Sequence, residues 1–163
     1  MDRQLEEYLD QVRDRLVAKH QKLATAESCT GGLVSQQVTA IPGSSDWFEG
    51  GVVAYSNAVK HQLLKVPIDA LEHYGAVSET VAKLMAQGVI AALQADVAIS
   101  ITGIAGPGGG SDEKPVGTVW IGWASRVQES AQCFHFAGDR QAVRHQALLS
   151  ALAGLVRFLD NKD

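Results

Sequence analysis

Apolar residues along the chain follow two periods that alternate from one segment to the next. A spacing of three or four residues, which is typical of an amphipathic helix, marks four long stretches. Their apolar positions are Leu5, Leu9, Val12, Leu16 and Val17; Leu33, Val34, Val38 and Ile41; Val81, Leu84, Met85, Val89, Ala92 and Leu93; and Val143, Leu148, Leu149, Leu152, Leu155 and Val156. We therefore expect four helices there. A shorter helix that carries Lys60, Leu63 and Leu64 is expected after Ser56 or Asn57, and Ser78 is expected to cap the third long one.

Short runs of apolar and β-branched residues between these helices predict strands. The expected strands cover residues 22–26, 51–55, 96–102, 116–124 and 131–136. The second run is small and apolar, which is typical of a buried strand, and the last two are expected to pair as a hairpin. Strands that alternate with helices predict an α/β layered domain, and the hairpin favours a mixed sheet over a purely parallel one.

Composition narrows the functional classes. A chain of 163 residues is expected to form one domain, and its net charge of -4 gives no electrostatic reason to bind nucleic acid or an acidic membrane surface. No apolar segment approaches the ~18 residues of a membrane span. Two cysteines, Cys29 and Cys133, are too few for a disulfide framework, which favours a reducing cytoplasm. The five histidines lack metal-ligand spacing, so we expect no metal site.

The segment from Ala26 to Gly32 joins the first strand to a helix and contains the residues of most chemical interest. Ser28 and Cys29 are both candidate nucleophiles. Backbone N–H groups around Thr30, Gly31 and Gly32 could face an anion at the start of the helix. The alternative is that Ser28 or Thr30 only caps the helix.

Other candidate site residues follow two later strands. Tyr55 ends one strand and Lys60 lies in the first turn of the next helix, so both can face one pocket. Thr102 and Gly103 end another strand and open the glycine-rich loop 103–110, and strand ends of this kind commonly form ligand crevices. That loop does not match a P-loop or a dinucleotide-binding fingerprint, and the chain has no G-x-S-x-G or S-x-x-K motif.

Arg140 and Arg144 lie one helical turn apart behind Gly138. This spacing could hold a phosphate between two guanidinium groups, or it could belong to a solvated helix face. The residues alone do not decide between the two.

Taken together, these motifs resemble the CinA C-terminal domain family. They occur in the family's order over nearly the whole chain. The matching segments are residues 26–32 (AESCTGG), 42–48 (PGSSDWF), 55–57 (YSN), 75–78 (GAVS), 102–109 (TGIAGPGG), 114–119 (KPVGTV) and 138–140 (GDR).

The resemblance implies a three-layer α/β/α domain over residues 1–163, often dimeric. It implies hydrolysis of the carboxamide of nicotinamide mononucleotide to nicotinate mononucleotide and ammonia, without a cofactor. It also implies a serine nucleophile assisted by lysine and tyrosine, which correspond to Ser28, Lys60 and Tyr55 here. Longer family members carry a further N-terminal domain, and its pyrophosphatase activity is not carried over to this chain.

The chemistry of these residues agrees with that assignment. A serine hydroxyl needs a neutral base, and a lysine with an ordinary pKa of about 10.4 becomes one near pH 7 only through burial or a nearby cation. Tyr55 could pass the proton between Ser28 and Lys60 or hold the lysine in place. Backbone N–H groups of the loop after residue 26, or of the Thr102–Gly103 turn, would stabilise the oxyanion.

Substrate contacts are expected from Thr30, Gly31, Gly32, Asn57, Thr102, Gly103, Arg140 and Arg144. Three alternatives stay open at this level. Cys29 could replace Ser28 as the nucleophile, because a helix N-terminus can lower a thiol pKa. The substrate could be another small phosphorylated amide. The domain could instead bind a nucleotide without catalysis, in a regulatory role.

Overall fold

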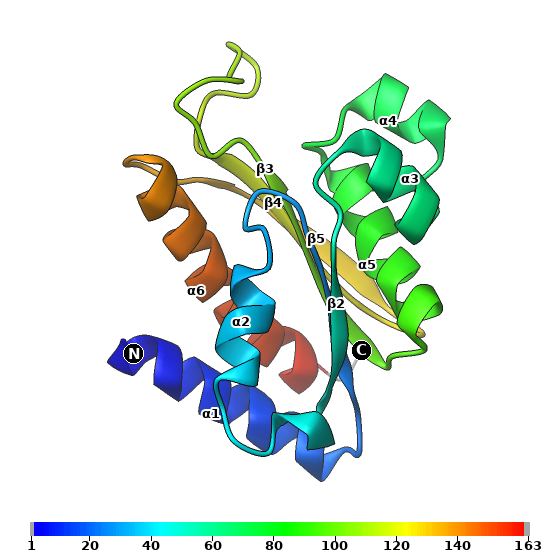
Figure 1. The fold of residues 1–163 in the computed structure, drawn as a ribbon, viewed down its shortest axis with the longest axis vertical. Coiled ribbons are helices and arrows are strands. Elements are labelled where there is room, and N and C mark those ends of the chain that lie inside the picture. The colour runs from blue at the N-terminus through cyan, green and yellow to red at the C-terminus, as the bar shows by residue number, and fades with distance from the viewer. Residues whose placement is uncertain (1, 162–163) are drawn as a thin grey trace.

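The computed structural model describes residues 2–161. Its centre is a five-stranded sheet with the order β2-β1-β3-β4-β5, shown in Figure 1. The strands are β1 (Leu23–Glu27), β2 (Phe48–Val53), β3 (Val97–Gly103), β4 (Thr118–Ser125) and β5 (Glu129–His135). β1 pairs in parallel with both β2 and β3, while β4 is antiparallel to β3 and to β5. The predicted mixed sheet and hairpin are confirmed.

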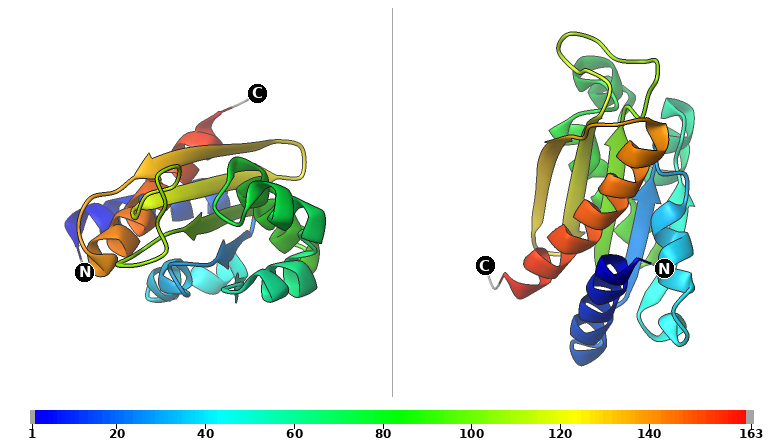
Figure 2. Two further views of the ribbon diagram at one scale, coloured as in Figure 1. Left: turned by 90° about the horizontal axis from the view of Figure 1, so that it is seen from above. Right: turned by 90° about the vertical axis from the view of Figure 1, so that its left-hand side faces the viewer.

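Helices cover both faces of this sheet, so the expected three-layer α/β/α arrangement is confirmed (Figure 2). One face packs against α1 (Arg3–Ala18), α2 (Leu33–Thr39) and α6 (Arg140–Asp160). The other packs against α3 (Asn57–Leu64), α4 (Ile68–Tyr74) and α5 (Glu79–Leu93). Alternation along β3 explains the division, because Val97, Ile99 and Ile101 enter the first apolar cluster and Ala98 enters the second.

Side-chain caps set the starts of the helices that carry or support the site. Ser56 accepts a hydrogen bond from Val59 N at 3.2 Å, and Ser78 accepts one from Val81 N at 3.2 Å. Asp139 accepts one from Ala142 N at 2.9 Å at the start of α6. The predicted caps Ser56 and Ser78 are therefore confirmed, each satisfying an otherwise unpaired N–H of the first turn.

The second strand differs from its prediction. It spans Phe48–Val53 rather than 51–55, and its residues alternate between half-buried and exposed. It is the edge strand of the sheet beside β1. Its small residues reflect close packing instead of burial on both faces, because a Cβ at Gly51 would lie 2.4 Å from Ser35 Oγ and 2.4 Å from Thr25 Oγ1.

Two short elements were not predicted as helical. The chain forms α4 after Pro67, and the segment between α2 and β2 contains the 3-10 helix η1 (Ser44–Asp46). α4 buries Leu71 against the second cluster but leaves Ile68 exposed. Seven residues are too few for the periodicity of apolar positions to distinguish a helix from a turn.

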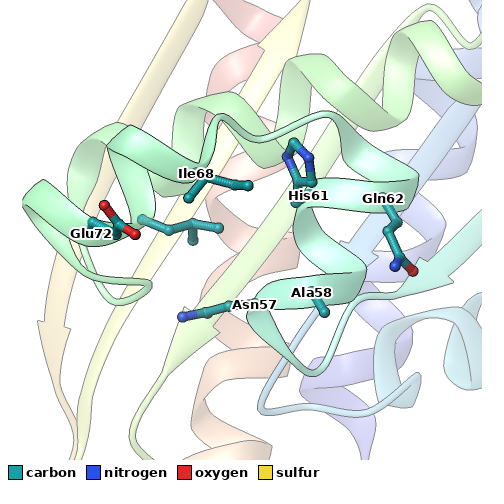
Figure 3. A pocket seen from close by; sticks show the side chains of 7 residues that line it. Asn57, Ala58, His61, Gln62, Ile68 and Glu72 are labelled. Atoms are coloured by element: carbon teal, nitrogen blue, oxygen red, sulfur yellow. The ribbon is translucent and has the colours of Figure 1, made fainter.

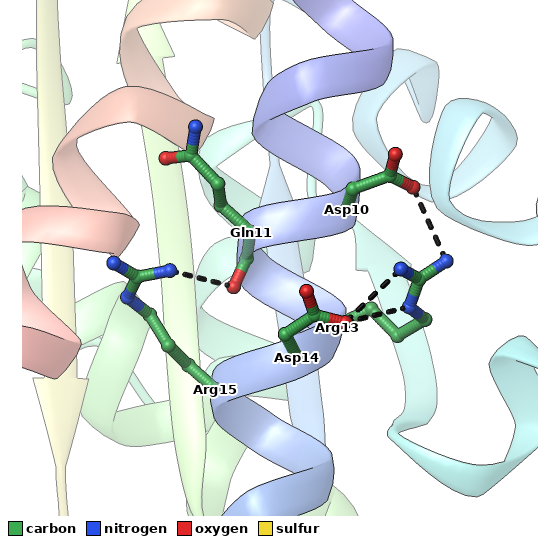
Figure 4. Close-up of polar contacts among 5 residues, drawn as sticks. All are labelled: Asp10, Gln11, Arg13, Asp14 and Arg15. Atoms are coloured by element: carbon green, nitrogen blue, oxygen red, sulfur yellow. Dashed lines mark hydrogen bonds and ion pairs between the residues drawn. The ribbon is translucent and has the colours of Figure 1, made fainter.

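Charged residues on α1 pair along its exposed face and with the C-terminal helix. Figure 4 shows Arg13 between Asp10 and Asp14, at nitrogen–oxygen distances of 3.2 and 3.0 Å. Arg15 donates to the Gln11 carbonyl and also contacts Asp160 at 2.8 Å, which joins α1 to α6. Exposed pairs of this kind contribute about 0–1 kcal/mol each, so the apolar clusters dominate the packing.

Within residues 2–161, no helix combines the length and apolar character that crossing a membrane would require.

Candidate active site

The candidate site lies where the three parallel strands end. Ser28 follows β1, Tyr55 follows β2, and Thr102 and Gly103 end β3. The carboxyl ends of neighbouring parallel strands lie at one edge of the sheet, which is the usual ligand crevice of such folds. A cavity of about 250 Å³ opens there, lined by Ser28, Cys29, Tyr55, Asn57, Lys60, Ala76, Val77, Thr102, Gly103, Ala105 and Arg140.

Ser28 and Lys60 form a direct pair in this cavity. Lys60 Nζ donates to Ser28 Oγ at 2.9 Å and to the Tyr55 carbonyl at 2.9 Å. The lysine side chain is 1% exposed, and no carboxylate of residues 2–161 forms an ion pair with it. Removal of the ammonium from water lowers the pKa of Lys60 below 10.5. A lysine in this setting can accept the serine proton.

Tyr55 contacts the pair through its backbone rather than its phenol. Its carbonyl accepts from Lys60 Nζ and, at 3.3 Å, from Ser28 Oγ. Its side chain is 61% exposed, and the hydroxyl lies 3.5 Å from Arg140 Nη2. The Tyr55 carbonyl thus contacts both Ser28 and Lys60, while its hydroxyl does not lie between them.

Cys29 is poorly suited to be the nucleophile. Its side chain is 6% exposed, and burial raises the pKa of the thiol to about 11, although its own backbone N–H and the cations Arg144 and Lys60 oppose that change. The thiolate is the nucleophilic form, and at neutral pH it would be only about 1 part in 10⁴. The expected lowering of this pKa by the helix N-terminus does not occur.

The side chain of Glu27 occupies the N-terminus of α2. Its buried carboxylate accepts from Val34 N at 3.0 Å, from Ser35 N at 3.1 Å and from Ser35 Oγ at 3.2 Å. The remaining N–H of the first turn, that of Leu33, donates to the Thr30 carbonyl. N–H groups at a helix start can attract an anion. Because these three already have acceptors within the chain, they are not free to hold the substrate phosphate that we expected there.

The loop after Ser28 requires glycine at positions 31 and 32 because of its backbone conformation. Gly31 and Gly32 have φ values of 62° and 106°, in the left-handed region that other residues rarely adopt. Neither glycine lines the cavity, and the Thr30 side chain is buried. The three residues thus shape the loop that presents Ser28.

The two arginines at the start of α6 are used differently. Arg140 lines the cavity and donates to the Gly106 carbonyl at 2.7 Å. Arg144 does not line the cavity. It donates to the carbonyls of Cys29 and Thr30, at 3.1 and 3.0 Å. The structure does not place the two guanidinium groups side by side around one space for a phosphate.

The remaining predicted residues form the wall of the cavity. Thr102 Oγ1 donates to the Ala76 carbonyl at 2.9 Å and fixes the segment before α5. A Cβ at Gly103 would lie 3.0 Å from the Thr118 carbonyl oxygen, so glycine there permits pairing with β4. Asn57 lines the cavity from the start of α3.

Sequence reasoning missed the role of Glu27 and the contributions of Ala76, Val77 and Ala105. Glu27 carried a usable signal, because a carboxylate beside a loop that opens a helix is a candidate cap. Ala76, Val77 and Ala105 carried no such signal, apart from their place in the matching motifs.

A larger cavity of about 410 Å³ lies next to the site, between α3 and α4, and Figure 3 shows Asn57, His61, Ile68 and Glu72 around it. Asn57 lines both cavities. His61 Nδ1 lies 2.9 Å from the Val66 carbonyl oxygen. Because a carbonyl oxygen can only accept a hydrogen bond, Nδ1 is the donor in this contact, which lies at the C-terminal end of α3. We take the smaller cavity as the candidate active site because it contains the contact between Ser28 Oγ and Lys60 Nζ.

In the part of the chain that the structure describes, no cluster of three or more His, Cys, Asp or Glu residues could hold a metal ion.

Comparisons with known proteins find relatives that match nearly the whole chain. The chain is 51% identical over 164 residues to a nicotinamide-nucleotide amidohydrolase PncC of Enterobacter agglomerans, covering 98% of this chain and 99% of that protein. It is 49% identical to the protein of the same name from Escherichia coli (strain K12), covering 98% of each. A crystal structure of the competence/damage inducible protein CihA from Agrobacterium tumefaciens superposes with a TM-score of 0.94 at 35% identity, covering 99% of this chain and 98% of that one.

The family model that matches this chain belongs to the same family that the sequence motifs resemble. The CinA C-terminal domain matches residues 5–159, which include every element of the sheet and every residue of the cavity. This chain belongs to the CinA C-terminal domain family.

Proposed function

We propose that this chain hydrolyses the carboxamide of nicotinamide mononucleotide to nicotinate mononucleotide and ammonia. The observation that carries the proposal is the contact of 2.9 Å between Lys60 Nζ and Ser28 Oγ in a cavity at the strand ends. The names of the relatives from Enterobacter agglomerans and Escherichia coli supply the substrate class.

The first half of the proposed reaction acylates the serine. Ser28 Oγ attacks the carboxamide carbon while neutral Lys60 takes the hydroxyl proton. The resulting ammonium then donates that proton to the amide nitrogen, the C–N bond breaks, and ammonia leaves. The pyridine carboxyl group remains as an ester on Ser28.

The second half releases the product. Lys60 takes a proton from water, which attacks the ester carbon, and Ser28 Oγ leaves with the proton returned by the lysine. The product is nicotinate mononucleotide. These steps use only groups of the chain and water.

The negative oxygen formed in both halves needs hydrogen-bond donors. The N–H groups of Cys29 and Thr30 donate to no oxygen among residues 2–161, and both belong to the loop directly after Ser28. We assign them as the oxyanion donors, a role that backbone N–H groups commonly fill in acyl transfer.

We assign the substrate's phosphate to Arg140. It is the only arginine that lines the cavity among the described residues, and its Gly106 contact uses a single nitrogen, Nη1. A guanidinium group has enough N–H donors to hold a phosphate with its other edge. Thr102 and Asn57 would then face the ribose and ring portions of the substrate.

We also propose that the chain acts in the cytoplasm and forms a homodimer. Cys29 and Cys133 are both free thiols, which suits a reducing compartment. The homodimer follows from the family resemblance, and light scattering of the purified chain tests it.

The activity is tested by ammonia release from nicotinamide mononucleotide, nicotinamide riboside, free nicotinamide and an unrelated phosphorylated amide. Wild-type protein should prefer the mononucleotide, and Ser28→Ala should abolish release while Cys29→Ala retains it. The reverse pattern for these two variants would overturn the assignment of the nucleophile.

The same panel decides between this proposal and its alternatives. Preferential turnover of the unrelated phosphorylated amide would indicate a different amidohydrolase. Binding of nicotinamide mononucleotide without ammonia release would indicate a regulatory nucleotide-binding role.

A further inference from the structure

We propose that Arg144 is a positioning residue that orients the backbone N–H groups of the loop after Ser28, and that it does not bind the substrate phosphate. The inference rests on the proposed function and assigns a separate role to each of the two arginines that begin α6.

Arg144 connects two distant parts of the chain through a pair of hydrogen bonds. Its Nε donates to the Cys29 carbonyl at 3.1 Å and its Nη2 to the Thr30 carbonyl at 3.0 Å. A Cβ at Gly31 would lie 3.7 Å from the same Nη2, so the guanidinium group packs closely against this loop. One edge of the fork is therefore already occupied by two successive carbonyls.

The helix that carries Arg144 is a firm support. Its neighbour Val143 and the next-turn residues Ala147 and Leu148 are buried in the apolar cluster between α6 and the sheet. Glu27 holds the other end of the loop through the N–H groups of α2. The loop is thus fixed from α6 on one side and from β1 on the other.

Because the peptide bond is planar, the contacts of Arg144 with the two carbonyls also fix the direction of the N–H groups that follow them. In a trans peptide unit, the C=O and the following N–H point in opposite directions. Because the Cys29 carbonyl points toward Arg144, the Thr30 N–H points away from it. That N–H donates to no oxygen in residues 2–161. The Gly31 N–H, in contrast, donates to the Ser28 carbonyl. Arg144 therefore selects the orientation of the peptide unit that supplies one proposed oxyanion donor.

A phosphate role fits Arg144 less well than Arg140. Arg144 is absent from the lining of the cavity, whereas Arg140 contributes to it. Binding a phosphate through the occupied edge would break both carbonyl contacts and release the loop that carries the nucleophile.

The experiment compares Arg144→Met, Arg144→Lys and Arg140→Met, with Arg157→Met as the matched control, since Arg157 is an exposed arginine near the other end of α6. Turnover is measured with nicotinamide mononucleotide and with nicotinamide riboside, which lacks the phosphate. Binding of the mononucleotide is measured separately by calorimetry, with each variant placed in a Ser28→Ala background.

Arg144→Met should lower kcat/KM at least about tenfold, because a misplaced oxyanion donor typically costs about 10²–10³ in rate. The loss should be the same for both substrates, and the Kd of the mononucleotide should stay within about threefold of the Ser28→Ala parent. Arg144→Lys should recover part of the rate, since one ammonium can reach a carbonyl but cannot reproduce the fork. Arg140→Met should instead weaken binding of the mononucleotide, which raises its Kd.

A loss confined to the phosphorylated substrate, or a Kd weakened about tenfold by Arg144→Met, would overturn the proposal. Hydrogen exchange supplies a readout that does not depend on turnover. Amides of residues 29–35 should exchange faster in Arg144→Met than in Arg157→Met, and unchanged exchange would also overturn it.

Failure of the proposed function is recognised separately. Wild-type protein that neither binds the mononucleotide nor releases ammonia refutes that function, and the exchange experiment then still decides whether Arg144 holds the loop.

Discussion

Replacement of Lys60 by methionine separates the chemistry of the site from its packing. The methionine side chain is also unbranched and fills a similar volume, but it has no group that can accept a proton. Since Lys60 is 1% exposed and lies on α3 between Ser28 and the Tyr55 carbonyl, the substitution removes the amine without opening the site to water.

The two contacts of Nζ set the expected magnitudes. Loss of the contact with Ser28 removes the proposed general base, and general bases contribute about 10²–10⁴ in rate, or about 3–5 kcal/mol of transition-state stabilisation. Loss of the contact with the Tyr55 carbonyl costs less, because that oxygen still accepts from Ser28 Oγ at 3.3 Å. A neutral hydrogen bond contributes about 0.5–1.5 kcal/mol, so we expect the free energy of unfolding at neutral pH to change by about 1 kcal/mol or less.

The effect of pH on stability follows from the lowered pKa of Lys60. In the pH interval between the folded-state pKa and 10.5, the unfolded chain binds more protons at this site than the folded chain. The contribution of Lys60 to the free energy of unfolding therefore rises with pH through that interval and is least favourable below it. Lys60→Met should remove this contribution. The free energy of unfolding of the variant, relative to that of wild type, should therefore be highest at the low end of the pH interval.

The assay follows ammonia release from nicotinamide mononucleotide across pH, together with urea unfolding. Wild-type kcat/KM should rise to a plateau with a midpoint below 10.5, the ordinary lysine value. Lys65→Met is the control, because Lys65 is an exposed lysine just after the same helix, where it donates to the Gln62 carbonyl. A Lys60→Met variant with kcat/KM within about threefold of wild type would refute the role of Lys60 as the base.

Three further predictions concern neighbours of the pair. Cys29→Ala should keep kcat/KM within about threefold of wild type, because the thiol with its raised pKa is almost entirely protonated; a loss of about 100-fold would make Cys29 the nucleophile. Tyr55→Phe should lower kcat/KM less than about tenfold, since the carbonyl that contacts Lys60 remains, and a loss like that of Lys60→Met would show that the phenol relays the proton. Glu27→Gln should lower the free energy of unfolding by about 2–4 kcal/mol in urea titrations, because an amide NH₂ cannot accept from both Ser35 N and Ser35 Oγ. An unchanged urea midpoint would mean that Glu27 does not hold α2.

Periodicity and motif order determined much of this protein from sequence. The long helices, the strands and the caps at Ser56 and Ser78 follow from local patterns, because an amphipathic helix must bury one stripe and an unpaired N–H needs an acceptor. The position of Ser28 after a strand and of Lys60 one helical turn into the next helix also follows from spacing. The resemblance to the family combined them into one site.

Tertiary structure alone decided how that site is connected. The edge position of β2, the phenol of Tyr55 against Arg140, the carboxylate of Glu27 on α2 and the contacts of Arg144 all join residues whose relation is set by the packing of separate elements. Arg140 and Arg144 are equivalent in a helical pattern, yet a single turn of α6 puts one in the cavity and the other on the loop. Local sequence specifies which chemical groups are present, while the direction of each group depends on contacts between separate elements, which for Arg144 span more than a hundred residues.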